Sequence, residues 1–257
     1  MPYSHRLQGS RFELKYVIDD ALVRPLRDFA LTYLEHDEHA KPENNWEYFV
    51  HSLYLDSRAL MLCRATMHSH KNRFKLRIRF YDESPDSPVF FEIKRRNSEV
   101  ILKQRAAVRR EAVDRILGGD WPRRSDLFKT GDEDLGAVER FCSLRDTIHA
   151  IGQVYVSYIR EAYVTPNDNS VRMTFDRRIY AIPWEGGLTL ESTHPPLFPN
   201  IGGTVLELKF TNRFPSWMRQ MVRVFDLERV SMAKYVACVR TLRRYPGMAA
   251  PHREIAV

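Results

Sequence analysis

The sequence predicts an α+β protein, built on an eight-stranded antiparallel β-barrel (a tunnel) with a polar, basic lumen and with helices packed outside. The first observation is charge at every second position of short segments, most clearly where Arg73, Lys75, Arg77 and Arg79 alternate with apolar residues. Side chains on a strand alternate between its two faces, so this segment has a cationic face and an apolar face. The second observation is that eight segments show strand-like alternation or composition, and eight strands can close a barrel.

The expected strands are rich in β-branched and aromatic residues and end at polar or Pro-containing turns. In chain order they cover residues 11–18, 48–56, 72–81, 88–96, 99–108, 153–164, 170–179 and 203–211.

Helices are expected between the strands. Asp19 or Asp20 can cap a helix whose apolar residues, from Leu22 to Leu34, recur at helical spacing, and a short helix follows Ser57. Further helices are expected at residues 109–117, 133–150 and 215–225. Their one-sided apolar patterns predict packing against the outside of the sheet.

Composition and length favour one globular domain with an anionic partner. Residues 1–245 contain no long linker, repeat or low-complexity run, so a single domain is expected, followed by a disordered tail at 246–257. The net charge of +7 favours phosphate-rich partners.

The cysteines and apolar segments indicate where the protein works. Cys63, Cys142 and Cys238 are too widely spaced for a CxxC metal site, which fits a reducing, cytoplasmic compartment. No apolar run has the length of a signal peptide's core or of a membrane span. Attachment to a membrane would therefore need a membrane-protein partner.

If the charged strand faces converge on a closed lumen, that space collects ten cations and three glutamates. The cations are Lys15, Lys75, Arg77, Arg79, Lys94, Lys103, Arg105, Arg160, Arg172 and Lys209. Removing such charges from water costs on the order of several kcal/mol per ion. A hydrated tunnel that receives a multiply charged anion resolves this cost, because arginine forks pair with phosphate oxygens. The pattern predicts a linear chain of phosphates as ligand.

The three glutamates, Glu13, Glu92 and Glu207, each stand two positions before a cation on the same strand face. A phosphate chain in a cell carries Mg²⁺ or Mn²⁺, and a carboxylate beside the phosphates can complete the metal's oxygen shell. Glu207 is the first choice for such a ligand. For each glutamate the alternative is a counterion that neutralises the neighbouring cation.

Several ordered motifs carry a family resemblance over about residues 10 to 240. They are Phe12-Glu13-Leu14-Lys15-Tyr16, Ser52-Leu53-Tyr54-Leu55-Asp56-Ser57, Lys75-Leu76-Arg77-Ile78-Arg79-Phe80-Tyr81, Phe91-Glu92-Ile93-Lys94-Arg95, Tyr158-Ile159-Arg160-Glu161-Ala162-Tyr163, Arg172-Met173-Thr174-Phe175-Asp176-Arg177, Leu206-Glu207-Leu208-Lys209-Phe210 and Ala233-Lys234-Tyr235. In this order and spacing the chain resembles the VTC domain, the polyphosphate polymerase module of the vacuolar transporter chaperone, within the CYTH-like triphosphate tunnel metalloenzyme superfamily.

The resemblance implies an antiparallel tunnel that binds triphosphate or polyphosphate with a divalent metal on Glu207. The residues that match the family's phosphate-coordinating positions are Lys15, Arg77, Arg79, Lys94, Lys103, Arg160, Arg172 and Lys234. The chain departs from the superfamily pattern at Arg11, where a first glutamate is expected, and from the family pattern at Ala233, where a serine is typical.

The implied activity is transfer of the γ-phosphoryl group of ATP, or another nucleoside triphosphate, to a growing polyphosphate chain. Arg77, Arg79, Arg160 and Arg172 would hold the transferred group, together with Mn²⁺ or Mg²⁺ on Glu207.

Two other functions would use the same cations of the predicted lumen. One is hydrolysis of triphosphate or of a nucleotide, and the other is non-catalytic binding of polyphosphate or inositol phosphates. Nucleic-acid binding is disfavoured, because it would need aromatic side chains next to the charges to stack on the bases. Phe74 and Phe80 lie on the opposite strand face.

Overall fold

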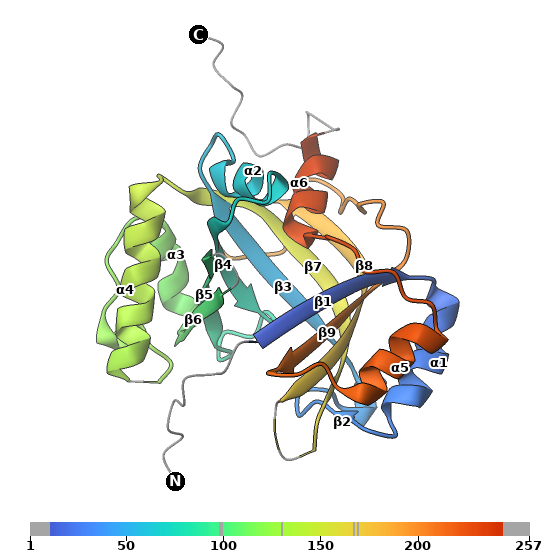
Figure 1. Cartoon of the computed structure of the whole chain (residues 1–257). Coiled ribbons are helices and arrows are strands. Elements are labelled where there is room, and N and C mark those ends of the chain that lie inside the picture. Colours follow the sequence, from blue (N-terminus) through green and yellow to red (C-terminus); the bar gives the residue numbers. More distant parts are fainter. Residues whose placement is uncertain (1–10, 98–99, 130, 167, 169, 244–257) are drawn as a thin grey trace. The chain divides into compact units, whose positions relative to one another are not determined.

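The computed structural model describes residues 11–97, 100–129, 131–166, 168 and 170–243 of the chain (Figure 1). It confirms an α+β protein with a large antiparallel sheet and, among the described residues, six α-helices. The predicted tail at 246–257 lies outside the described residues. None of the described helices has the length and apolar character needed to cross a bilayer.

All eight predicted strands are present, with ends that differ by a few residues. They are β1 (Arg11–Ile18), β3 (Glu47–Asp56), β4 (Asn72–Phe80), β5 (Val89–Asn97), β6 (Val100–Val108), β7 (Ile151–Val164), β8 (Val171–Pro183) and β9 (Thr204–Thr211). A ninth strand, β2 (Glu35–His36), pairs with β7 and is too short for alternation to reveal it. The pairing order is β1-β9-β8-β7-β3-β4-β5-β6. Because β1 and β6 stand at its two ends, the predicted closure into a barrel is not confirmed.

The helices also follow the sequence pattern, with one addition. They are α1 (Val23–Ala30), α2 (Met61–Met67), α3 (Arg110–Leu117), α4 (Asp132–Thr147), α5 (Ser216–Val224) and α6 (Lys234–Arg243), with short 3₁₀ turns η1 (Asp20–Leu22), η2 (Pro42–Asn44) and η3 (Arg124–Asp126). Asp19 caps η1 through a 2.8 Å bond from the Ala21 amide, as the sequence predicts. Helix α6 is not among the predicted elements, because its valines and threonine favour a helix only weakly and apolar residues cover most of its surface.

The chain forms two compact units whose segments alternate along the sequence. Unit 1 consists of Met1–Tyr48, Ile159–Arg178 and Asn200–Met232, and unit 2 of Phe49–Tyr158, Ile179–Pro199 and Ala233–Val257, as far as these ranges are described. Strands β3, β7 and β8 contribute residues to both units.

In unit 1, α1 and α5 lie side by side and bury the apolar faces of β1, β8 and β9 (Figure 1). Leu206 and Leu208 of β9 join this core with Leu26 and Met218, so the residues between them on β9 point to the other face. Gly203 allows β9 to start next to β1: a Cβ there would lie 2.1 Å from the Ile18 carbonyl oxygen, and φ is +146°.

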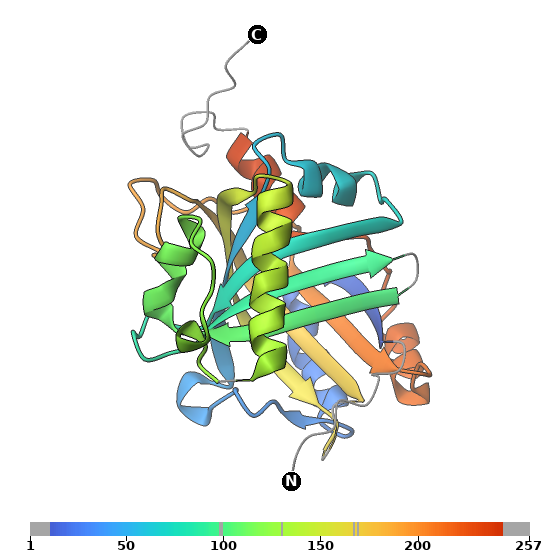
Figure 2. The same ribbon diagram turned by 90° about the vertical axis from the view of Figure 1, so that its left-hand side faces the viewer.

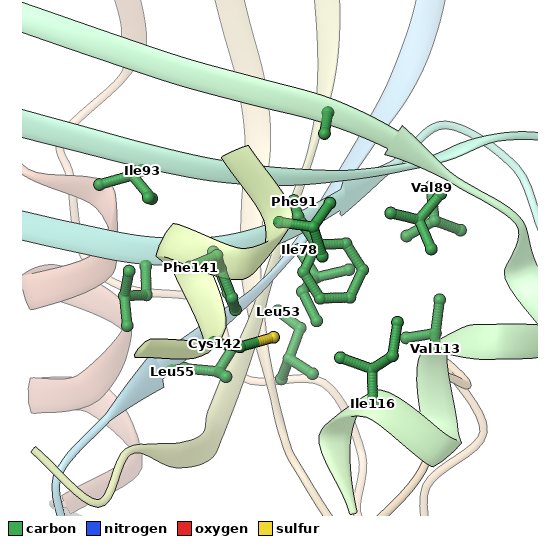
Figure 3. Close-up of a cluster of buried hydrophobic side chains, with 14 of the residues drawn as sticks. Leu53, Leu55, Ile78, Val89, Phe91, Ile93, Val113, Ile116, Phe141 and Cys142 are labelled. Carbon is green, nitrogen blue, oxygen red and sulfur yellow. The ribbon is translucent and has the colours of Figure 1, made fainter. Parts of the chain in front are cut away.

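In unit 2, α3 and α4 cover one face of β4, β5 and β6 (Figure 2). Ile78, Phe91 and Phe141 belong to this core, and the rings of Phe91 and Phe141 meet edge to face at 4.9 Å (Figure 3). Leu76, Ile78 and Phe80 of β4 are therefore buried in this core, and Phe74 packs against it partly buried. The odd-numbered cations of the same strand lie on the opposite face, as the period-two pattern predicts.

Candidate functional site

The predicted site residues fall into two sets, one in each unit. The unit 1 cluster comprises Glu13, Lys15, Asp37, Arg160, Arg172, Asp176, Glu207 and Lys209. The unit 2 cluster comprises Lys75, Arg77, Arg79, Glu92, Lys94, Lys103, Arg105 and Lys234. Each set is assembled by strand register, because residues paired across antiparallel strands share a face and lie close together.

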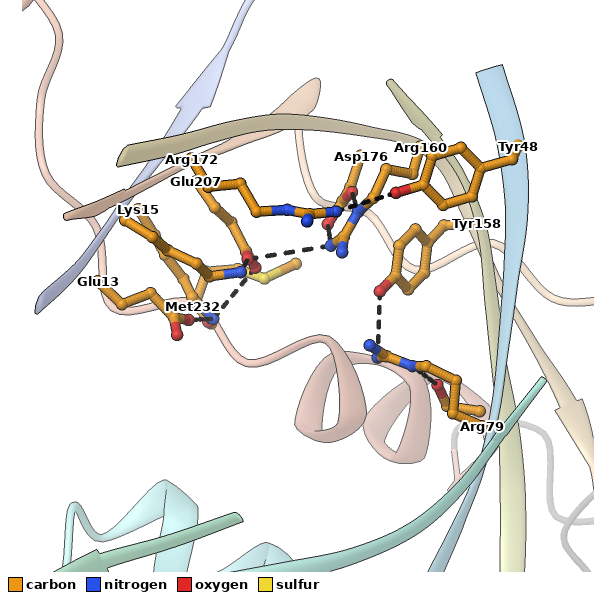
Figure 4. Close-up of polar contacts among 12 residues, drawn as sticks. Glu13, Lys15, Tyr48, Arg79, Tyr158, Arg160, Arg172, Asp176, Glu207 and Met232 are labelled. Carbon is orange, nitrogen blue, oxygen red and sulfur yellow. Dashed lines mark hydrogen bonds and ion pairs between the residues drawn. The ribbon is translucent and has the colours of Figure 1, made fainter. Parts of the chain in front are cut away.

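In the unit 1 cluster, the ladder of β1 and β9 pairs Glu13 with Lys209 and Lys15 with Glu207. Opposite charges therefore alternate across two strands. The Lys15 ammonium lies 3.1 Å from Glu13 and 3.5 Å from Glu207, and Lys209 lies 2.7 Å from Glu207. Glu207, 5% exposed, is also 4.0 Å from the Arg160 guanidinium (Figure 4).

The two arginines of this cluster are held by carboxylates that the sequence analysis does not include. Arg160 donates two parallel hydrogen bonds to the fully buried Asp176, at 2.7 and 2.8 Å. Arg172 pairs with Asp37 at 2.7 Å and donates to the Tyr48 hydroxyl at 3.1 Å (Figure 4). Asp176 could have been found from its even spacing after Arg172 on β8, whereas Asp37 follows the two-residue strand β2 and shows no periodic signal.

In the unit 2 cluster, register builds two rows across β4, β5 and β6. One row contains Lys75, Lys94 and Lys103, and the next contains Arg77, Glu92 and Arg105. Glu92, 1% exposed, accepts from Arg77 Nε at 2.6 Å and pairs with Lys103 at 2.9 Å and Arg105 at 3.5 Å. Burial alone would raise the pKa of Glu92, but Arg77, Arg79 and Lys103 outweigh it and hold that pKa well below its usual value.

Arg79 differs from its neighbours, because its hydrogen bonds within the described residues go to hydroxyl groups. Its Nε donates to Ser52 at 3.1 Å and its Nη2 to Tyr158 at 3.4 Å, and the residue is 8% exposed. Lys234 of α6 places its ammonium 5.1 Å from the centre of the Tyr158 ring. Ser52, Tyr54 and Tyr158 are missing from the predicted site. The first two alternate on β3, so their period-two spacing could have identified them.

The two clusters differ in charge balance. The unit 1 cluster has four cations and four carboxylates, whereas the unit 2 cluster has seven cations and Glu92. Lys103 and Arg105 of the unit 2 cluster are exposed to solvent, whereas Arg79 and Lys234 are buried. Cations gathered on an accessible strand face attract anions, so the unit 2 cluster is the stronger candidate for the anion-binding surface.

Carboxylate oxygens suit a hard divalent cation, and the unit 1 cluster offers them in Glu13 and Glu207. Within the described residues, no group of three or more His, Cys, Asp or Glu side chains is arranged to hold a metal. Mg²⁺ usually takes one or two carboxylates and completes its shell with water and substrate phosphates. Glu207 and Glu13, which both contact the Lys15 ammonium, fit this mode. Lys15 and Lys209 would repel a metal cation, and the negative charge of bound phosphate would offset this repulsion. Glu207 shares the Lys15 ammonium with a second carboxylate, Glu13, whereas Glu92 is the one carboxylate among the residues of the unit 2 cluster and neutralises three cations, which favours its role as a counterion.

Tyr54 gives the unit 2 cluster a titrating group. Burial raises its pKa, but Arg77, Lys75 and Arg79 lower it to about 8. Above that pH the phenolate adds negative charge beside the Arg77 guanidinium, whose Nη1 lies 3.3 Å from the hydroxyl. We expect inorganic triphosphate to bind more weakly between pH 7.5 and 9, as measured by calorimetry, with most of this loss removed in Tyr54→Phe.

Lys103 is the second group in this pH range. Burial lowers its pKa to about 8 against the attraction of Glu92, although its side chain is 46% exposed and water offsets part of the shift. Lys103→Arg keeps the charge at all these pH values. The ligand's own ionisation is the same in experiments with wild type and with the double variant Y54F/K103R. If the triphosphate affinity falls equally with pH in both proteins, both assignments are contradicted.

Comparisons with known proteins agree with this architecture. A solved structure from Bacillus halodurans, described as a "putative adenylate cyclase", matches with a TM-score of 0.50 and 11% identity over 88% of this chain and 95% of that chain. Another of the same description, from Vibrio parahaemolyticus, has a TM-score of 0.44 and 10% identity over 89% of this chain and 98% of that chain. At such identities the first likeness concerns the fold alone. No curated protein matches the sequence significantly. The family model of the VTC domain matches residues 10–243, and the protein therefore belongs to the VTC domain family.

Proposed function

We propose that this protein is a polyphosphate polymerase that transfers the γ-phosphoryl group of ATP to the end of an inorganic polyphosphate chain. The observation that carries the proposal is the alignment of cations in rows across the unit 2 cluster, which the register of β4, β5 and β6 produces. Rows of charge along a strand suit a linear polyanion. Membership of the VTC domain family supports polyphosphate as that polyanion.

The chain's residues would act by positioning and by charge neutralisation. The attacking terminal oxygen of polyphosphate is already anionic near pH 7, so the reaction needs no protein nucleophile and no strong base. The oxygen attacks the γ-phosphorus, the bond to the β-phosphate oxygen breaks, and ADP leaves. In the unit 2 cluster Arg77 and Arg79 would hold phosphate oxygens, and in the unit 1 cluster Arg160 and Arg172 would do so, while the lysines of each cluster orient the phosphates bound there.

Glu207 and Glu13 would hold Mn²⁺ or Mg²⁺ beside the phosphates. When bound, such an ion neutralises charge on the β- and γ-phosphate oxygens. Lys15 and Lys209 hold the Glu207 carboxylate in place, and Asp176 aligns Arg160 next to it.

The metal role of Glu207 can be tested with Glu207→Gln, which keeps the size of the side chain and removes its charge. We expect kcat to fall on the order of 100-fold, as for the loss of one preorganised electrostatic contact, and the Mn²⁺ concentration required for half-maximal rate to rise. Glu161→Gln is the matched control: Glu161 is also a buried carboxylate of unit 1, but it binds Arg27 and Arg177. A Mn²⁺ requirement that is unchanged in E207Q would contradict the assignment.

The activity itself is tested by incubating the protein with ATP and Mn²⁺ and separating the products on a gel. A ladder of polyphosphate with release of ADP is the expected result. Inorganic phosphate without a ladder would assign hydrolysis instead, and binding of triphosphate without turnover under either metal would assign a receptor. Cyclic AMP with pyrophosphate would point to the reaction named for the Bacillus halodurans protein.

A further inference from the structure

The first turn of α6 is connected to two arginines of the unit 2 cluster through two tyrosines. Tyr235 stacks on Tyr54, with ring centres 4.6 Å apart and planes within 10°, and the Tyr54 hydroxyl accepts from Arg77 at 3.3 Å. The preceding residue, Lys234, faces the ring of Tyr158, whose hydroxyl accepts from Arg79. Two adjacent residues of α6 are thus each connected to one arginine through one tyrosine: Tyr235 to Arg77 through Tyr54, and Lys234 to Arg79 through Tyr158.

Tyr235 is fixed at its other end by Asp56. The Tyr235 hydroxyl, in a side chain only 1% exposed, donates to Asp56 Oδ2 at 2.8 Å. Burial and the carboxylate raise the pKa of Tyr235 well above its ordinary value, so the phenol keeps its proton and remains a donor.

Asp56 is fully buried at the end of β3 and fixes α2 as well. Its oxygens accept from the amides of Ser57, Leu62 and Cys63 at 2.8 to 2.9 Å, which satisfies amides at the start of α2. One carboxylate therefore holds the end of β3, the start of α2 and the start of α6. The hydrogen bond from Tyr235 determines where the Tyr54 ring can stack.

We propose that Tyr235, held by Asp56, is a positioning residue that keeps Tyr54 and thereby the Arg77 guanidinium in the orientation required for phosphate binding. The geometry explains why the residue is a tyrosine: a phenylalanine could stack on Tyr54 but could not bond to Asp56. This inference rests on the proposed function for the identity of the ligand. It does not depend on turnover, because the orientation of Arg77 exists in the protein without ligand.

The test compares Tyr235→Phe with Tyr155→Phe. Tyr155 is also 1% exposed in unit 2 and donates to the Gly187 carbonyl at 2.8 Å, but its hydrogen bonds go to the 187–189 loop. Y235F loses one buried hydrogen bond and Y155F loses two, so we expect Y155F to lower the melting temperature at least as much as Y235F. Only Y235F is expected to weaken binding of inorganic triphosphate, by about tenfold, which corresponds to about 1.4 kcal/mol.

The second measurement is the ¹H–¹⁵N signal of Arg77 Nε in the protein without ligand, assigned with Arg77→Lys. The short bond from this Nε to Glu92 makes the signal sensitive to the orientation of the guanidinium. Y235F is expected to shift or broaden it, and Y155F to leave it unchanged. If Y235F does not fold, Tyr54→Phe takes its place, since it removes the hydroxyl that contacts Arg77.

The two measurements separate the inference from the proposed function. An unchanged Arg77 signal in the folded Y235F or Y54F variant would overturn the positioning role. Wild-type protein that binds no triphosphate would overturn the proposed function, and the Arg77 signal would then decide the positioning role by itself. A Y155F variant that weakens triphosphate binding as much as Y235F would also overturn the inference, because the effect would then be one of general stability.

Discussion

Replacing Glu92 by glutamine is expected to destabilise the protein by about 3 to 5 kcal/mol, the usual cost of breaking a buried ion pair from one side. Glu92 is 1% exposed and neutralises Arg77, Lys103 and Arg105, so its loss leaves three neighbouring cations without their shared carboxylate. The same change raises the positive charge of the unit 2 cluster. We therefore expect triphosphate to raise the melting temperature of E92Q by more than it raises that of wild type.

The experiment also decides between the two roles of Glu92. If Glu92 is a counterion, E92Q keeps the Mn²⁺ affinity of wild type, measured by electron paramagnetic resonance in the presence of triphosphate. If Glu92 is a metal ligand, Mn²⁺ binding weakens. Lys103→Met in the E92Q background removes one of the unneutralised cations and should recover part of the lost stability, whereas a double variant as unstable as E92Q would contradict the electrostatic explanation.

The strands could be predicted because their alternation extends over many residues. On β4, Leu76, Ile78 and Phe80 are buried while Lys75, Arg77 and Arg79 share the other face, and a slip of one residue would bury the cations under α3 and α4. Because this cost is large, the sequence of β4 strongly determines the face on which its charges lie. The same reasoning applies to Glu207 and Lys209, which alternate with the buried Leu206, Leu208 and Phe210 of β9.

The partners of the cations were harder to predict, because they come from segments without a period. Asp37 follows the two-residue strand β2, and nothing in its local sequence indicates that it pairs with Arg172. Counting only glutamates on strand faces therefore gives too large a charge excess for the residues of unit 1. With Asp37 and Asp176 included, the four cations of the unit 1 cluster are matched by four carboxylates, and this pairing could only be read from tertiary contacts.

Helix α6 shows a second limit of local sequence. Its residues Tyr235, Val236, Cys238 and Val239 are all buried, and its exposed polar residues, Arg240 and Arg243, come only in the last turn, so its first turn lacks the polar face that marks most surface helices. The bond between Tyr235 and Asp56 joins residues far apart in the sequence. Sequence motifs containing these residues indicated the family, but the contact between them required the structure.

Replacing Arg79 by methionine is expected to leave stability nearly unchanged and to remove most of the activity. Arg79 is 8% exposed and donates to the hydroxyls of Ser52 and Tyr158. Burial and the neighbouring Arg77 disfavour its charge, whereas Glu92 favours it, and the pKa of Arg79 lies above its ordinary value. An apolar side chain of similar length removes both the cost and the attraction, so we expect R79M without ligand to be within about 1 kcal/mol of wild type, measured by urea unfolding.

The activity of R79M should fall by about 10³-fold or more in kcat, the range for an arginine that contacts a transferred phosphoryl group, and triphosphate should no longer stabilise the protein appreciably. Arg145 is the matched control: it is 4% exposed in unit 2, but it contacts Asp146 and the Ile116 carbonyl at the end of α3. Arg145→Met should lose stability and keep its activity. A buried cation whose removal leaves the fold intact but abolishes turnover is retained for its ligand, and phosphate is the anion that this cluster is suited to bind. If R79M is less stable than wild type and retains its turnover, Arg79 serves the fold and the phosphate-binding assignment of the unit 2 cluster loses its strongest residue.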